Sequence, residues 1–183
     1  MSEVKSTIDL VMERTKGMLM SEEERRAIQI RESAEKANGI LMGLREARIA
    51  PDELDQVLSE EEDEDKRTDL RRALLRAAID DLALDRAKVM AEILAALAPA
   101  DLAGLIDEFE RLSEEYARRH ETMNSGATGN AIQDLAAIGI SGSALKPKME
   151  ADPAYQENLS RLNLEFQSRL DLIRTAMLEK TAT

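Results

Sequence analysis

The feature that most constrains this chain is an apolar stripe in its last third. The stripe consists of Tyr155, Leu159, Leu162, Phe166, Leu170, Ile173 and Met177. Its spacings of three and four residues place all members on one face of an α-helix. Asp152 precedes the stripe as a cap, and Pro153 stands at the first helical position, where proline is tolerated. The pattern predicts a long helix over residues 153–180.

Weaker signals of the same kind predict helices over residues 6–19, 21–49, 52–97 and 99–123. The clearest is a capping box, in which Ser21 is followed three residues later by Glu24. Pro51 and Pro99 separate the middle helices, because the residue before a proline is pushed out of helical geometry. Asn38 and Gly39 leave open whether the helix over residues 21–49 is continuous.

Residues 124–152 differ from the rest of the chain, since they hold four of its eight glycines. The stretch IGISGSALKPK within it shows neither a helical period nor a clean strand alternation, so we expect an irregular segment. Its first part, residues 124–131, offers little apolar area and is expected to be mobile. Residues 135–150 are expected to form an ordered strap on the bundle, anchored by Leu135, Ile138, Ile140, Leu145 and Met149; a disordered linker is the alternative.

Composition points to helices throughout. Aromatic residues make up 2% of the chain and charged residues 34%, a balance typical of long helices packed along their length. The core must therefore be built from leucine, isoleucine, alanine and methionine. We expect an all-α fold: one domain over residues 1–183, an elongated antiparallel bundle of four to five helices, with the irregular glycine-rich segment before the last helix.

Charge and cysteine content exclude several classes of function. The formal net charge of −12 disfavours binding to the phosphate backbone of nucleic acids. No cysteine is present, which rules out disulfides, thiolate metal sites and cysteine nucleophiles. The stretch MSEVKSTIDLVMERTKG shows no secretory signal, and no apolar run approaches the length of a membrane span. We expect a cytoplasmic protein that binds neither nucleic acid nor membrane.

Two patterns that resemble ligand sites lack the context such sites need. Gly126 and Gly129 resemble a dinucleotide-binding turn, but the polar end of a helix precedes them where a buried strand is required. No lysine follows at the spacing of a phosphate-binding loop. His120 is the only histidine, and no Glu-x-x-His motif or cysteine accompanies it for metal binding. We read it as a cation at a helix C-terminus and expect no catalytic residue, metal or cofactor.

Acidic residues are concentrated in the run SEEEDED at residues 59–65. An EF-hand would need further oxygen ligands and a glycine here, but Arg67 and Thr68 stand in those places. Two interpretations remain for this run: a solvated helix start or bend, and an electrostatic docking patch for a basic partner.

Parts of the chain resemble a known family. The stretches KSTIDLVMERTK…SEEERR and GISGSALKP…EADPAYQ are similar to a family of small uncharacterised helical proteins from bacteria. The resemblance covers the two ends of the chain and not its middle. It implies a helical bacterial protein, brings no activity or site residues, and slightly favours a role for residues 139–153 beyond linking two helices.

Extended apolar seams without a reactive group of residues indicate a non-enzymatic helical interaction protein, such as an adaptor or a chaperone-like regulator. The expected contact residues are Ile138, Ile140, Leu145, Leu164 and Leu172. Leu164 and Leu172 widen the apolar face of the last helix, so we expect a homodimer in addition to a protein partner. The alternative is an enzyme or small-molecule-binding bundle with its site around residues 124–152.

Overall fold

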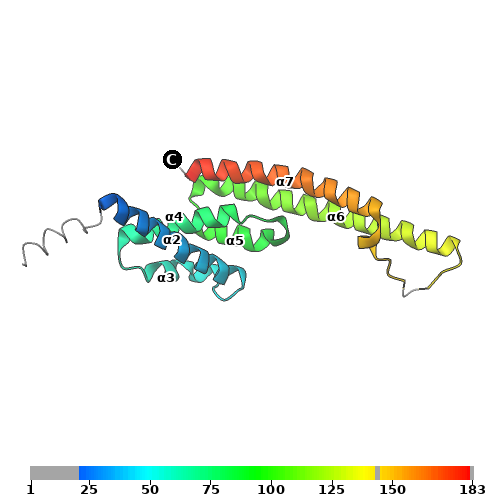
Figure 1. Cartoon of the computed structure of the whole chain (residues 1–183), viewed down its shortest axis with the longest axis horizontal. Coiled ribbons are helices and arrows are strands. Elements are labelled where there is room, and N and C mark those ends of the chain that lie inside the picture. Colours follow the sequence, from blue (N-terminus) through cyan, green and yellow to red (C-terminus); the bar gives the residue numbers. More distant parts are fainter. Residues whose placement is uncertain (1–20, 143–144, 182–183) are drawn as a thin grey trace, which may run out of the picture.

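The computed structural model describes residues 21–142 and 145–181, apart from the side chain of Glu150. Six α-helices and no β-strand occur in this part of the chain. The helices are α2 (Glu22–Arg45), α3 (Leu54–Ser59), α4 (Glu64–Asp80), α5 (Ala87–Leu97), α6 (Ala103–Ala137) and α7 (Pro153–Thr181). Helices α6 and α7 lie side by side as a long hairpin, and α2 to α5 gather beside one part of it (Figure 1). The prediction of an elongated all-α bundle is confirmed, whereas the helix predicted over residues 6–19 lies outside the described residues.

Helix α2 begins where the sequence predicts and ends four residues early. Ser21 Oγ accepts a hydrogen bond from the Glu24 N–H at 3.1 Å, and Glu24 Oε2 accepts one from the Ser21 N–H at 2.8 Å. The helix runs through Asn38 and Gly39 without a break. It ends because the chain turns at Ala47, whose φ is 54°. This turn returns the chain towards α3.

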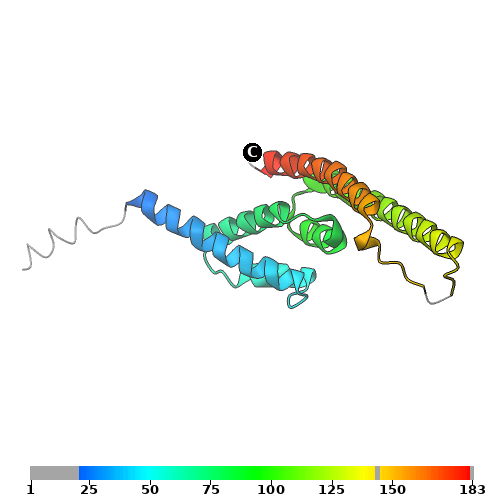
Figure 2. The same cartoon turned by 45° about the vertical axis from the view of Figure 1, so that its right-hand side comes forward.

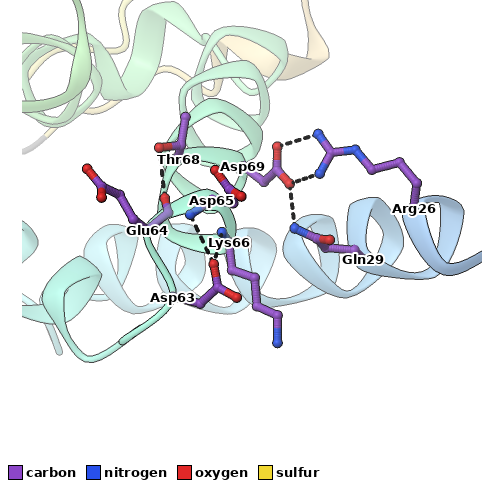
Figure 3. Close-up of polar contacts among 8 residues, drawn as sticks. All are labelled: Arg26, Gln29, Asp63, Glu64, Asp65, Lys66, Thr68 and Asp69. Carbon is purple, nitrogen blue, oxygen red and sulfur yellow. Dashed lines mark hydrogen bonds and ion pairs between the residues drawn. The ribbon is translucent and has the colours of Figure 1, made fainter. Parts of the chain in front are cut away.

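The prediction of one helix over residues 52–97 is wrong, because α3, α4 and α5 occupy that range. The acidic run at residues 59–65 forms the break between α3 and α4 and then the start of α4. Asp63 caps α4 by accepting hydrogen bonds from the N–H groups of Asp65 and Lys66 at 3.0 and 3.2 Å (Figure 3). The structure therefore bears out the helix start, and the docking patch for a basic partner stays a prediction.

The second break, between α4 and α5, is stabilised by α7. Arg174 donates hydrogen bonds to the carbonyl oxygens of Ile79 and Leu82 at 3.3 and 3.0 Å. A helix end leaves its last carbonyl groups without intrahelical partners, so a guanidinium placed there favours termination. The break depends on a residue more than 90 positions away in the sequence.

Helix α6 continues well beyond its predicted end at residue 123, so the irregular segment is shorter than expected and residues 124–131 are helical. Gly126 and Gly129 lie inside α6, and a Cβ at either position would meet no atom within 4 Å. Each glycine costs about 1 kcal/mol relative to alanine. Alanine and leucine are good helix formers, and the surrounding sequence ATGNAIQDLAA is rich in them. The two glycines are tolerated and do not stop the helix.

The helix ends instead at Gly139, whose φ of 84° is readily adopted only by glycine. The Gly139 N–H donates to the carbonyl oxygen of Ala136 at 3.0 Å, and the Ile140 N–H donates to that of Leu135 at 2.9 Å. These two bonds are those of a Schellman motif. The glycine that ends the helix is therefore Gly139, and not Gly126 or Gly129.

The core contains the apolar stripe of α7, as predicted. Six of its seven residues are buried: Tyr155, Leu162, Phe166, Leu170, Ile173 and Met177. Most other core residues are leucine, isoleucine, alanine and methionine from α2 to α6. Phe109 and Phe166 are the two aromatic rings that are fully buried.

An aromatic clamp joins α6 to α7 around Phe166. The guanidinium groups of Arg119 and Arg169 lie 5.2 and 5.0 Å from the centre of its ring. Arg169 donates two hydrogen bonds to Glu115 at 3.0 and 2.7 Å, and Arg119 donates two to Glu165. Hydrogen bonds from these arginines lower the pKa of both glutamates below the ordinary value of 4.5.

The clamp predicts a loss of stability in acid. Because Glu115 and Glu165 have a lower pKa when folded, their contribution is present above about pH 4.5 and is lost as the pH falls through the folded pKa. We expect the double variant Glu115→Gln/Glu165→Gln to flatten the fall in the free energy of unfolding below pH 5, measured by urea denaturation. Glu92→Gln/Glu110→Gln, at two exposed positions, is the control; equal pH profiles for both double variants would contradict the prediction.

Candidate interaction surfaces

A groove of about 1030 Å³ lies between α2 and α4, with the last residues of α7 at one end. The two helices run in the same direction, because α3 and the turns around it carry the chain back between them (Figures 1 and 2). Ion pairs mark this alignment: Arg26 meets Asp69 near the start of the helices, and Arg45 meets Asp81 at 3.2 Å near their ends. We call this hollow the α2–α4 groove.

A buried carboxylate holds α2 to α4 at the first end of the groove (Figure 3). Asp69 is 9% exposed and accepts two hydrogen bonds from Arg26 and one from Gln29, the last at 2.8 Å. The hydrogen bond to Asp69 also raises the pKa of Arg26. A charge taken out of water needs such partners, so this contact fixes the position of α2 along α4.

Between the two ends, small side chains leave the groove open. Ala34 of α2 and Ala73 and Ala77 of α4 line it, and Leu178 of α7 adds apolar surface at one end. Ile30 stands in the same lining and is 53% exposed. Alanine side chains are too short to fill the space between two helix backbones, and they allow another backbone to approach closely. The result is an apolar surface that this part of the chain does not cover.

A row of charges follows the α4 side of the groove. Arg72, Arg76 and Asp80 are spaced by four residues, so they lie on successive turns of one face. All three are exposed, and none of their side chains has a hydrogen bond or ion pair with another described residue. Among the described residues, nothing competes with a molecule in the groove for these three charges.

The contact residues predicted from sequence are exposed but lie elsewhere. Ile138, Leu164 and Leu172 are 72%, 70% and 72% exposed, Ile140 is 46% exposed, and Leu145 is half-buried. The structure does not bring them together with the α2–α4 groove. Leu164 and Leu172 belong to α7, whereas the others follow the end of α6.

The prediction that Ile138 and Ile140 anchor a docked strap is wrong. The Schellman motif at Gly139 turns the chain at the tip of α6, which extends past the start of α7 (Figure 1). No helix lies beside this tip, so the two isoleucines remain in solvent. Met149, further along, is buried as expected. Ile140→Asp should therefore leave the free energy of unfolding largely unchanged.

A smaller pocket of about 550 Å³ lies in the region to which the alternative function was assigned. His120, Asn124 and Thr128 of α6 line it together with residues 145–147, Met149 and the first turns of α7. The His120 ring stacks on Tyr116 with centroids 5.9 Å apart. Within residues 21–142 and 145–181 there is no group of three or more histidine, aspartate or glutamate side chains placed to hold a metal ion.

Sequence reasoning missed the α2–α4 groove, although two signals for it were present. One is the pair of small residues Ala34 and Ala37 on α2. Ala37 is buried in the core, whereas Ala34 lines the groove. The other is the four-residue spacing of Arg72, Arg76 and Asp80, beside the alanines of α4. Neither signal reveals a groove until the two helices are known to be neighbours.

Comparison with known proteins adds no family to this description. No protein-family model, no curated protein and no solved structure matches the chain. The resemblance to a bacterial family therefore stays a prediction. Among the described helices, none combines the length and the apolar character that crossing a bilayer requires.

The buried carboxylate leads to a stability prediction. Asp69→Asn removes the charge that pairs with Arg26 and should lower the free energy of unfolding by about 1–3 kcal/mol. Asp107→Asn, at an exposed position on α6, should change it by less than about 0.5 kcal/mol. Chemical denaturation at pH 7 measures both. If Asp69→Asn is as stable as the wild type, Asp69 does not hold α2 to α4.

Proposed function

We propose that this chain is a non-enzymatic helical interaction protein, an adaptor or chaperone-like regulator of the cytoplasm, that binds an amphipathic helix of a partner protein. The observation that carries this proposal is the open α2–α4 groove. From Arg26 to Asn38 its lining covers about 18 Å of α2, at a rise of about 1.5 Å per residue. Binding an amphipathic helix in an apolar groove is a common mode of protein recognition.

The charge row supports a helix as the ligand. Because Arg72, Arg76 and Asp80 repeat every four residues, they complement a ligand whose own charges repeat at the helical period. The partner helix should carry three charged residues at intervals of one turn, two adjacent acidic residues and a basic residue at one end of the series. Complementary charges of this kind mainly determine which partner is accepted and how quickly it binds. This requirement distinguishes the partner among amphipathic helices of similar apolarity.

Photo-crosslinking in the cells that make the protein tests the proposal. A benzophenone amino acid at Ile30, inside the groove, should capture a partner through an amphipathic helical segment. The same residue at Glu35, which is 71% exposed and does not line the groove, should not capture it. Arg72→Glu/Arg76→Glu should abolish the Ile30 adduct by reversing two charges in the row.

Arg111→Glu/Arg118→Glu makes the same change of net charge on α6 and should leave the adduct intact. An Ile30 adduct that survives the reversal of Arg72 and Arg76 would contradict a charge-guided groove. So would equal adducts from Ile30 and Glu35.

Self-association through α7 is a second proposal, supported by Leu164 and Leu172. These leucines lie eight residues apart, two turns along one face of the helix, and are 70% and 72% exposed. Light scattering should give the wild type a mass near twice that of one chain, 20.4 kDa, and Leu164→Glu/Leu172→Glu the mass of one chain. A wild type that keeps the mass of one chain at all concentrations would contradict it.

A further inference from the structure

The smaller pocket, of about 550 Å³, lies towards the end of the α6–α7 hairpin that points away from α2 to α5 (Figure 1). It shares no lining residue with the α2–α4 groove. Three parts of the chain line it: α6, the first turns of α7, and the segment that leads into α7. Its volume lies within the range of roughly 300–1,000 Å³ that is typical of small-molecule sites.

Three polar side chains of α6 form one wall of this pocket. His120, Asn124 and Thr128 are spaced by four residues, so they lie on successive turns of one helix face. All three are half-buried, and each can donate a hydrogen bond. The His120 ring stacks on Tyr116, but none of the three side chains has a hydrogen bond or ion pair with another described residue. The wall therefore offers a row of donors that the described fold does not use.

Tyr155 of α7 adds a buried hydroxyl to the same pocket. The residue is 8% exposed and lines the pocket, yet its hydroxyl has no hydrogen bond with another described residue. Buried tyrosine hydroxyls are normally paired, because a polar group that is removed from water without a partner destabilises the fold. A molecule bound in the pocket can supply the partner that this hydroxyl lacks.

The charge of the lining indicates the charge of the ligand. Lys146 lines the pocket, and its ammonium group has no ion pair with another described residue. No described aspartate or glutamate belongs to the lining, although the chain carries a net charge of −12. The carboxylate of Asp152, just before α7, accepts hydrogen bonds from the N–H groups of Ala154 and Tyr155 at 2.8 and 3.3 Å, so it is engaged in capping the helix. A lining of donors and one cation favours an anion.

The rest of the lining is apolar, which indicates that the ligand is more than a bare ion. Leu145, Pro147 and Met149 lie on the segment before α7, and Leu159 lies one turn after Tyr155. Met149 is buried, and the other three are half-buried. Surfaces of this kind are stabilised by contact with an apolar body, because burial removes them from water. The pocket therefore combines groups that bind an anion with groups that bind hydrocarbon.

From this arrangement we infer that the pocket binds a small organic anion, in which a carboxylate or phosphate group is attached to a short apolar body. The Lys146 ammonium and the Tyr155 hydroxyl bind the anionic group, since hydrogen bonds to a charged group are stronger than those between neutral groups. The donor row on α6 orients the ligand, and the apolar lining covers its body. This activity is additional to helix binding in the α2–α4 groove and uses none of the same residues.

NMR titration of the full chain at constant pH tests this inference. His120 is the only histidine, so its imidazole C–H signals report on the pocket without ambiguity. Hexanoate or hexyl phosphate should shift these signals in a saturable way, and the tighter of the two identifies the preferred anionic group. Hexylamine, with the same chain and the opposite charge, should bind at least about tenfold more weakly than that anion. Inorganic phosphate, which has no apolar body, should be weaker to the same degree.

Two neighbouring lysines separate recognition in the pocket from the effect of overall charge. Lys146→Glu should weaken binding of the tighter anion at least about tenfold, because it replaces the cation of the lining by an anion. Lys148→Glu makes the same change of charge at an exposed position that does not line the pocket, and should weaken binding less than about twofold. Tyr155→Phe keeps the buried ring without its hydroxyl and should weaken binding about threefold or more.

Four results would overturn the inference: no saturable shift of the His120 signals at up to about 10 mM of either anion, equal binding of hexylamine and the anions, equal losses in the two lysine variants, or full binding by Tyr155→Phe. An unfolding temperature equal to that of the wild type, measured without ligand, shows that a variant loses binding and not its fold. Each outcome leaves the photo-crosslinking test of a partner helix unaffected, because the pocket and the α2–α4 groove share no residue.

Discussion

The hydrogen-bonded pair of Arg26 and Asp69 is the contact on which the proposed site depends. It fixes α2 against α4 near the start of both helices, and the Arg45–Asp81 pair fixes them again near their ends. Between these points Ala37 and Leu74 are buried, and Ala34, Ala73 and Ala77 line the surface above them. The α2–α4 groove is therefore a consequence of two polar contacts that hold the helices in place and of alanines that cannot close the gap. Without Asp69, the spacing of Arg72 and Arg76 would have no fixed relation to α2.

The groove also depends on α7, because this helix contacts both α6 and α4. Phe166 and its flanking arginines hold α7 to α6, while Arg174 reaches across to the end of α4. This last contact ends α4 at Asp80, the final member of the charge row, and leaves Leu178 beside the groove. Helix α7 thus supplies buried residues to the α6–α7 hairpin, and its last residues lie at one end of the groove.

The sequence predicted those elements whose signals are local. The capping box at Ser21 and the stripe after Pro153 each require only neighbouring residues, and both are confirmed. The ends of helices were harder to predict, because Gly126 and Gly129 are as conspicuous as Gly139. What decides between them is whether the backbone forms a Schellman motif, which occurs only at Gly139 among these three.

Features that depend on distant residues could not be predicted from local patterns. The break after Asp80 is stabilised by Arg174, and the groove exists because α2 and α4 are parallel neighbours. The exposed positions of Ile138 and Ile140 follow from how far α6 extends past α7. In each case the sequence contains the residues, but their relation appears only when separate helices are placed side by side.

A double-mutant cycle between Arg26→Gln and Asp69→Asn, measured by urea denaturation, tests most directly whether this pair holds α2 against α4. The account predicts that the two changes are coupled by at least about 0.5 kcal/mol, because each removes the same contact. Losses in the free energy of unfolding that simply add would contradict it.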